Sequence, residues 1–319
     1  MTTLADLAEL VRAPAALSVP GDVVAGAAAA GALSPRTPAL AGASVLLYWA
    51  GMAANDWADR RLDAVERPER PIPSGRVTPA AAVGLAAGLT AAGVGLAAAV
   101  GGRRAAALAV PLAATIWGYD LLAKNTAAGP AVMAACRGLD VLLGASGGRV
   151  TRALPAAATV AAHTWTVTAL SRREVTGADA ALPMRTLAGT ALVAASAAVA
   201  GPGIRRAATR TADRARTPDQ ARTPDQAGLR ASRTGLPGIA AVLPAVLAGW
   251  YAARYGAAQV EVVRDPSAGK VRAAVGAGIT GLPALQGALT ARGGAGLLGL
   301  AVAAAAPLGR RLARKVSPT

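Results

Sequence analysis

The sequence predicts an all-α integral membrane protein, and three observations support this fold class. Hydrophobic residues fill 54% of the 319 positions, mean hydropathy is +0.42, and charged residues make up only 16%, against about 25% in a typical soluble domain. Long apolar runs recur between short charged connectors, near the roughly 17–25 residues that a helix needs to span the hydrocarbon core of a bilayer. The alternating hydrophobicity of a membrane β-barrel does not occur in the sequence.

The apolar runs predict nine or ten membrane-crossing helices, because the first and last runs are marginal in length. In chain order the runs are Val19–Leu33, Pro38–Ala54, Pro79–Gly102, Ala105–Leu122, Ala127–Gly148, Ala153–Leu170, Ala181–Ile204, Leu236–Ala253, Val271–Leu289 and Gly293–Leu308.

Cation placement predicts the orientation. With the amino terminus in the cytoplasm, Lys and Arg concentrate in the cytoplasmic connectors and at both ends, as the positive-inside tendency requires. We therefore expect a multi-pass protein of the cell (inner) membrane. The exception is the Arg-rich segment Arg205–Arg233, where the hexamer Ala215–Gln220 is repeated as Ala221–Gln226. Either this segment lies outside despite its charge, or one of the later predicted spans is wrong. The Arg, Thr, Pro and Asp content of the segment predicts a disordered insert, at about 205–234, in a single membrane-embedded domain covering residues 1–319.

The composition also limits which binding partners and structural classes are expected. The net charge of +16 would raise nucleic acid as a partner, but aromatic residues make up 3% of the chain and Phe is missing, so base-stacking platforms are not expected. The bias toward Arg, Ala and Gly is explained more simply by a GC-rich genome. The single Cys136 excludes a disulfide scaffold, and the single His163 excludes a His-rich metal site. The expected partner is therefore the lipid bilayer and not nucleic acid, and the oligomeric state stays open.

An acidic cluster follows the second apolar run. If the helix continues, Asp56, Asp59 and Asp63 lie at i, i+3 and i+7 on one face, with Asn55 beside them. Three close carboxylates repel one another, and a bound divalent cation removes the conflict. Hard oxygen ligands that leave coordination places for phosphate favour Mg²⁺.

The connector after this cluster is basic and rich in proline. It contains Arg67, Arg70 and the run Pro71-Ile72-Pro73-Ser74-Gly75-Arg76, and guanidinium groups bind phosphate through forked hydrogen bonds. An acidic metal face, arginines and an apolar interior together describe a site for a diphosphate with an apolar tail. The alternative is a solvated helix end, with Asp59 and Asp63 paired to Arg60, Arg61 or Arg67.

These two segments resemble a known motif. The pattern Asn-Asp-x-x-Asp-x-x-x-Asp at Asn55–Asp63, followed by Arg-Pro-Ile-Pro-Ser-Gly at Arg70–Gly75, is similar to the first aspartate-rich motif of the UbiA superfamily of membrane prenyltransferases. A second stretch also resembles that superfamily, with Asp120 where a proline is usual; it comprises Tyr119, Lys124, Thr126 and Pro130. The resemblance covers residues from about 10 to 200.

The resemblance implies a fold and a reaction. The fold is a bundle of about nine transmembrane helices around a central cavity. The reaction is Mg²⁺-dependent transfer of an isoprenyl group from an allylic isoprenyl diphosphate donor to an aromatic or other lipophilic acceptor, with the active site toward the cytoplasm. Asp56, Asp59 and Asp63 are the expected catalytic residues. Metal is expected on Asn55, Asp56, Asp59, Asp63 and Glu174, and diphosphate on Arg67, Arg70, Lys124 and Arg172.

The second motif of the superfamily, an Asp-x-x-x-Asp pair, is degenerate here. Ser171 takes the place of the first aspartate and Glu174 stands near the second. One well-held Mg²⁺ could suffice, Arg172 and Arg173 could take over diphosphate charge, or catalysis could be lost while isoprenoid binding persists. The two arginines could also be cytoplasmic topology anchors.

Polar residues also occur inside the apolar runs. Arg137 and Asp140, at i and i+3, are interpreted as an internal pair that lines the cavity or ties two helices, because a buried charge is costly unless it is matched. Tyr119 is a further cavity-lining candidate. His163 is interpreted as a packed core residue. The leading hypothesis is thus a membrane prenyltransferase, and the alternatives are a non-catalytic isoprenoid-binding or lipid-handling protein and an ion-coupled transporter.

Overall fold

A computed structural model describes residues 2–13, 18–179, 181–199 and 236–305. These residues form helices and connecting turns, and none of them lies in a strand. The helices are α1 (Leu4–Leu10), α2 (Pro20–Ala30), α3 (Thr37–Glu66), α4 (Pro79–Gly118), α5 (Gly129–Gly144), α6 (Val150–Ser171), α7 (Ala181–Ala198), α10 (Leu236–Arg264), α11 (Ala268–Arg292) and a last helix over Gly296–Ala305. The insert expected at about 205–234 lies outside the described residues.

Most predicted runs coincide with a helix, but several differ in length; the run Leu236–Ala253, for example, continues to Arg264 as α10. The run Pro38–Ala54 continues to Glu66 as α3, so the acidic cluster is helical. The run Val19–Leu33 becomes the 11-residue α2, which ends at Gly31 with φ +67°. At 1.5 Å per residue α2 extends about 16 Å, too short to cross a hydrocarbon core of about 30 Å. Glycine ends the helix because only it enters this left-handed conformation without strain.

The long α4 contains a break. Gly102 has φ +67° and ψ −160° inside it, which divides the helix between the two predicted runs Pro79–Gly102 and Ala105–Leu122. The helix ends in a π-helical turn, Tyr119–Ala123, that leads to Lys124. Such turns place one extra residue per turn and frequently occur at functional sites.

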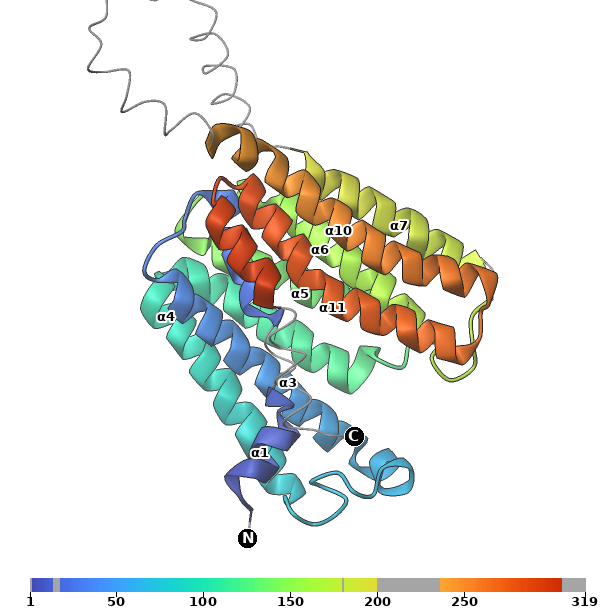
Figure 1. Ribbon diagram of the computed structural model, residues 1–319. Helices are drawn as coiled ribbons and strands as arrows, with labels where there is room; N and C mark the ends of the chain where they lie inside the picture. The colour runs from blue at the N-terminus through green and yellow to red at the C-terminus, as the bar shows by residue number, and fades with distance from the viewer. Residues whose placement is uncertain (1, 14–17, 180, 200–235, 306–319) are drawn as a thin grey trace, which may run out of the picture.

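The helices form two groups joined through α2 and α5 (Figure 1). The first group pairs α3 with α4, and the second packs α6, α7, α10 and α11 together. Each group has its own apolar core: Leu47, Leu112 and Ile116 belong to the first, whereas Val160 and Leu285 belong to the second.

The contact between α2 and α5 depends on glycine. A Cβ on Gly26 would lie 1.8 Å from the Val141 carbonyl oxygen, and one on Gly144 would lie 2.0 Å from the Val23 carbonyl oxygen. The two backbones therefore touch, as small residues permit between membrane helices. This close approach brings the polar residues of α2 and α5 within reach of each other.

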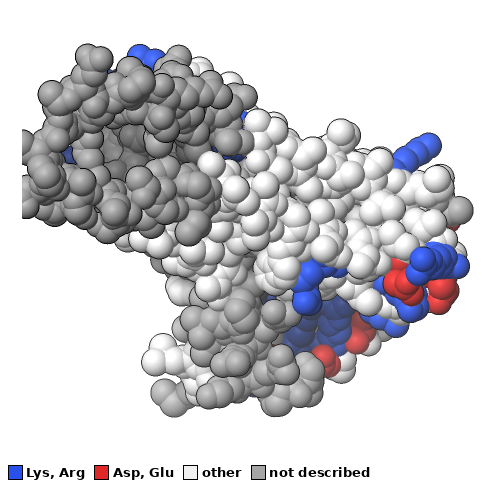
Figure 2. Space-filling model, turned by 45° about the horizontal axis from the view of Figure 1, so that its top comes forward, with Lys and Arg blue, Asp and Glu red and all other residues white. Residues whose placement is uncertain are grey.

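The surface of the described residues is largely apolar, as expected for a protein surrounded by lipid. Two of the described helical segments, Thr37–Glu66 and Pro79–Ala123, are long and apolar enough to cross a membrane, so the expected count of about nine is not confirmed. The view in Figure 2 shows an uncharged middle; the acidic side chains and most of the basic ones in view gather at the lower right, and a few basic ones lie at the opposite edge. Large apolar side chains also lie exposed on later helices, namely Leu154, Leu192, Val246 and Ile279. Apolar surface of this extent is rare on soluble monomers.

Candidate functional site

The candidate site is built on the last turns of α3. Asp56 and Asp63 are buried, with 4% and 2% of their surface exposed, and Asp59 lies between them on the helix. A buried carboxylate requires a compensating charge or strong hydrogen bonds. The predicted acidic face is therefore present, and it points into the protein.

Three cationic side chains neutralise the three aspartates. Arg70 Nη1 lies 2.6 Å from Asp63 Oδ2 and 3.3 Å from Asp56 Oδ1. Arg12 Nη2 lies 2.7 Å from Asp56 Oδ1, and Lys124 Nζ lies 2.6 Å from Asp59 Oδ1. The repulsion that predicted a metal is thus relieved by ion pairs among the described residues. The alternative pairing with Arg60, Arg61 or Arg67 is not found among the described residues, where Asp59 pairs with Lys124 and Asp63 with Arg70.

The loop after α3 directs Arg70 inward. Ile72 and Val77 are buried in the apolar cluster beneath the loop, and Ser74 N donates to Arg70 O at 3.0 Å. Gly75 has φ +76°, which completes the turn. Arg67 caps α3 through its backbone and is exposed, and the contacts of its side chain do not include the three aspartates. Of the two predicted loop ligands, the structure brings Arg70 into the cluster and leaves Arg67 outside it.

The π-helical turn after α4 supplies the opposite wall. Lys124 follows this turn directly, and Asp120 within it is buried and accepts a hydrogen bond from Asn55 Nδ2 at 3.2 Å. Gly51 gives α4 room to approach α3, since a Cβ there would lie 2.6 Å from Ile116 Cγ2. Tyr119 is half-buried in the same turn. The turn therefore adds a fourth carboxylate, Asp120, to the site.

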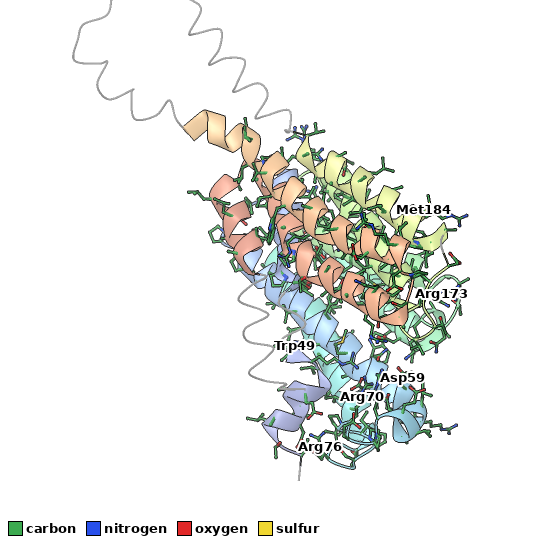
Figure 3. All side chains as sticks on the ribbon, turned by 45° about the vertical axis from the view of Figure 1, so that its right-hand side comes forward. Trp49, Asp59, Arg70, Arg76, Arg173 and Met184 are labelled. Carbon is green, nitrogen blue, oxygen red and sulfur yellow. The ribbon has the colours of Figure 1, made fainter. Side chains whose placement is uncertain are left out.

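Arg172 connects the second group of helices to this wall. From the end of α6 its Nη1 donates to the backbone carbonyls of Lys124 and Thr126. Its guanidinium thus contacts the backbone of Lys124, whose side chain pairs with Asp59. Asp59, Arg70, Arg76 and Arg173 are all found at this end of the fold (Figure 3).

Glu174 is held elsewhere. Arg272 donates to its backbone carbonyl at 2.8 Å, and the following residues pair with the turn between α10 and α11 through Ala178 N and Pro266 O. Partial burial raises the pKa of the Glu174 carboxyl, and the Arg272 charge opposes this shift. The structure places Glu174 against that turn, and its contacts do not include the aspartates of α3.

The donor chemistry of the acidic face fits a hard cation such as Mg²⁺. The cations contact one oxygen of each carboxylate, which leaves Asp56 Oδ2, Asp59 Oδ2 and Asp63 Oδ1 as further acceptors, together with Asn55 Oδ1. Within the part of the chain that the structure describes, however, no three Asp, Glu, His or Cys side chains converge as a metal centre. To bind a metal on this face, the carboxylates would have to move closer to one another, and the arginine and lysine side chains that pair with them would have to move away.

A second polar cluster is buried between α2, α3, α5 and α11. Arg137 Nε lies 2.7 Å from Asp22 Oδ2, and Gln286 Nε2 donates to Asp22 Oδ1 at 2.6 Å. The Arg137 guanidinium also lies over the Tyr48 ring, 5.4 Å from its centroid. The expected internal pair of Arg137 with Asp140 is corrected: the partner of Arg137 is Asp22, which the α2–α5 contact brings close.

Asp140 instead accepts a hydrogen bond from Ser44 of α3. Its other oxygen, Oδ2, is buried without a hydrogen-bond partner among the described residues. Because Asp22, Arg137 and Asp140 come from two helices and contact two more, the cluster ties four helices together. His163 is likewise buried, and its Nδ1 lies 2.8 Å from the Tyr251 hydroxyl, consistent with a packed core residue.

Sequence reasoning missed Arg12, Asp22, Asp120 and Gln286. Asp120 carried a signal, since it stands where the resembling family has proline. Arg12 and Gln286 carried none, because their partners are 44 and 264 positions away along the chain.

Fold and site together define a helical membrane protein with a cation-neutralised acidic site at one end of its bundle. The model of the UbiA prenyltransferase family matches residues 18–201, and the chain belongs to this family, whose members are embedded in membranes.

Shorter matches link the chain to curated relatives. Digeranylgeranylglyceryl phosphate synthase of Methanothrix thermoacetophila is 49% identical over 69 residues, which are 21% of this chain and 25% of the relative. The synthase of the same name from Natronomonas pharaonis is 44% identical over 85 residues, 26% of this chain and 31% of the relative. These matches span a quarter to a third of the relatives' length.

Two solved structures share the fold. One, described as digeranylgeranylglyceryl phosphate synthase in membranes, has a TM-score of 0.61 at 14% identity and covers 90% of this chain and 97% of its own. The other, a UbiA homologue from Aeropyrum pernix in its apo form, has a TM-score of 0.53 at 19% identity and covers 83% and 96%.

Proposed function

We propose that this protein is a membrane prenyltransferase that moves an isoprenyl group from an allylic diphosphate to a lipophilic acceptor. The observation that carries the proposal is the acidic face of α3, surrounded by Arg12, Arg70 and Lys124, in a chain of the UbiA prenyltransferase family. The names of the partial relatives support an isoprenoid donor.

In this proposal, the donor diphosphate takes over the cationic side chains that pair with the aspartates in its absence. Arg12, Arg70 and Lys124 turn from the carboxylates to phosphate oxygens, and Arg172 adds charge from α6. Asp56, Asp59 and Asp63 would hold Mg²⁺, with Asn55 as a further oxygen donor. The metal, when bound, neutralises charge on the diphosphate. Glu174 and Arg67 are weaker candidates because of their positions.

The residues then stabilise charge separation. The allylic C–O bond breaks, its electron pair leaves with the diphosphate, and the arginines and Lys124 stabilise the negative charge that develops there. The carbocation is attacked by the acceptor, which forms the new bond and releases a proton. An apolar interior protects the cation from water.

We place the protein in the cell membrane with this site toward the cytoplasm. Crossing segments are α3, the two halves of α4 on either side of Gly102, α5, α6, α7, α10 and α11, with α2 entering part of the bilayer. Counted with α2, this proposed set comprises nine segments. The charged end in Figure 2 is where loops would meet water.

The test is turnover by the purified protein with Mg²⁺, allylic diphosphates of five to twenty carbons and an extract of membrane lipids. Release of diphosphate with a prenylated product supports the proposal. Asp56→Asn should lower the rate by about 10²–10³, the scale of losing one charge-stabilising group, whereas Arg264→Gln, at an exposed pair with Glu261, should leave it unchanged. If Asp56→Asn and Asp59→Asn match the parent, the proposal is wrong.

A second candidate is favoured by one observation. Glu174 is held against the α10–α11 turn, so the second acidic motif does not join the first. A non-catalytic isoprenoid-binding protein would need only the first site. It would bind a prenyl diphosphate tightly without releasing diphosphate, and any prenylated product would exclude it.

A further inference from the structure

The amino-terminal helix α1 lies beside the acidic site, against the end of α3 (Figure 1). Leu10 is fully buried and Val11 nearly so, in an apolar cluster with Ala53, Ile72 and Val77. The helix is capped by Thr3, whose side chain accepts from Asp6 N while Asp6 accepts from Thr3 N. With only seven residues, α1 would be marginal alone, so its order depends on what it contacts.

Arg76 connects α1 to the loop that carries Arg70. Its Nη1 lies 2.8 Å from Asp6 Oδ1 and 2.7 Å from Glu9 Oε2, and its Nη2 lies 3.0 Å from Glu9 Oε1. The guanidinium is fixed from the loop side by Ser74 Oγ and the Glu69 carbonyl. Exposed ion pairs are usually weak, but forked geometry shared by several groups is the recognised exception.

Arg12 follows α1 and reaches the site. Its φ is +45°, the one positive value for a non-glycine among the described residues. This conformation brings Cβ close to the following carbonyl, so it persists only where neighbouring contacts hold it. Arg12 Nη2 contacts Asp56 Oδ1 at 2.7 Å, while Nη1 lies 3.8 Å from the Met52 sulfur, a weak acceptor that a phosphate oxygen could replace.

We infer that α1 is a positioning strap, in which Arg76 holds Asp6 and Glu9 and thereby keeps Arg12 at the aspartate face, where it receives the donor diphosphate. Arg76 is a positioning residue, since its own hydrogen bonds go to α1 and to its loop. Arg12 is the group that touches the ligand. This inference rests on the proposed function, because it assigns to α1 the positioning of one diphosphate-binding group of that site.

The experiment uses the full chain in nanodiscs and inorganic pyrophosphate with Mg²⁺ as the probe, measured by calorimetry, together with KM and kcat for the donor. Arg76→Gln and the double variant Asp6→Asn with Glu9→Gln should each weaken pyrophosphate binding by about three- to tenfold and raise KM to match. The value of kcat should fall less than it does in Arg12→Gln, because Arg12 is still present but is held less firmly. Arg76→Lys should recover part of the affinity, and Arg264→Gln is the matched control.

Two results separate positioning from general damage. Arg12→Gln combined with Arg76→Gln should bind no more weakly than Arg12→Gln alone, because the strap acts only through Arg12. Hydrogen exchange of residues 4–11 should speed up in Arg76→Gln without a change elsewhere in the described helices.

The inference is overturned if Arg76→Gln binds pyrophosphate as the parent does while Arg12→Gln is weakened, or if the losses of the two variants add. Failure of the proposed function is a different result: the parent itself would neither bind pyrophosphate nor turn over any donor. Hydrogen exchange still reports on the strap in that case, and unchanged exchange of residues 4–11 in Arg76→Gln overturns it.

Discussion

Lys124 Nζ lies 2.6 Å from Asp59 Oδ1, which joins the turn after α4 to the acidic face of α3. The ammonium group is enclosed by the protein, so the aspartate is its principal charge partner among the described residues. This pair connects the two motif segments of the sequence, and it is the contact that a diphosphate must share or replace.

Replacing Lys124 should weaken donor binding. Lys124→Met keeps much of the side-chain volume but removes the charge, and a hydrogen bond to a charged group contributes about 1.5–3 kcal/mol. We expect pyrophosphate with Mg²⁺ to bind about tenfold more weakly or worse, measured by calorimetry. Lys270→Met, at a more exposed pair with Glu261, is the control and should bind as the parent does. Equal binding by both variants would contradict the role of Lys124.

Removing Arg137 should destabilise the fold strongly. Arg137→Met leaves Asp22 buried without its ion-pair partner, and breaking a buried pair in this way costs about 3–5 kcal/mol. Thermal unfolding in detergent measures the loss. Adding Asp22→Asn removes the stranded charge while keeping an acceptor for Gln286, so the double variant should recover most of the stability. A double variant as unstable as Arg137→Met would show that the pair is not the cause.

Glycine at the α2–α5 contact should resist substitution. Gly144→Ala places a methyl 2.0 Å from the Val23 carbonyl oxygen, and overpacking of this kind costs about 1–3 kcal/mol. Gly84→Ala on α4 is the matched control, because nothing lies within 4 Å of its Cβ position; there alanine should stabilise the helix by up to about 1 kcal/mol. Thermal unfolding should therefore shift in opposite directions for the two variants.

Docking of α1 should survive mild acid. Hydrogen bonds from the Thr3 side chain and backbone, with the Arg76 guanidinium beside them, lower the pKa of Asp6 from 3.8 to about 2. A lowered pKa means that Asp6 contributes stability above pH 3.8, which is lost as the pH falls toward 2. A dye on Leu4→Cys, an exposed position, should lose anisotropy in that window.

The comparison for this pH prediction is Asp6→Asn in the same labelled background. It should lack the part of the anisotropy change that protonation of Asp6 causes. Cys136 is buried, so the dye reports on α1. Loss of anisotropy already between pH 7 and 5 in the parent would contradict the prediction.

The parts of the structure that could be predicted are those encoded locally. Apolar length located the helices, and the spacing of Asp56, Asp59 and Asp63 placed them on one face, because both patterns depend on residues close in the chain. Arg70 was found for the same reason. The pairing of Arg137 was wrong because it depends on how closely α2 approaches α5, which the spacing of Arg137 and Asp140 on a single helix cannot reveal.

The parts that could not be predicted are set by tertiary contacts. Arg12 reaches Asp56 only because α1 folds back onto α3, and Glu174 is drawn to the α10–α11 turn by Arg272. Neither contact is indicated by residues that are close together in the sequence. Asp120 was visible as a departure from the resembling family, but its hydrogen bond with Asn55 depends on the π-helical turn.

The bond from Arg172 to the carbonyls of Lys124 and Thr126 has a mechanical consequence. It spans the seam between the first helices and the last ones, at the very segment that carries the ammonium group facing Asp59. Any movement of α6 relative to α4 would therefore act directly on the backbone of the residue whose ammonium group pairs with Asp59.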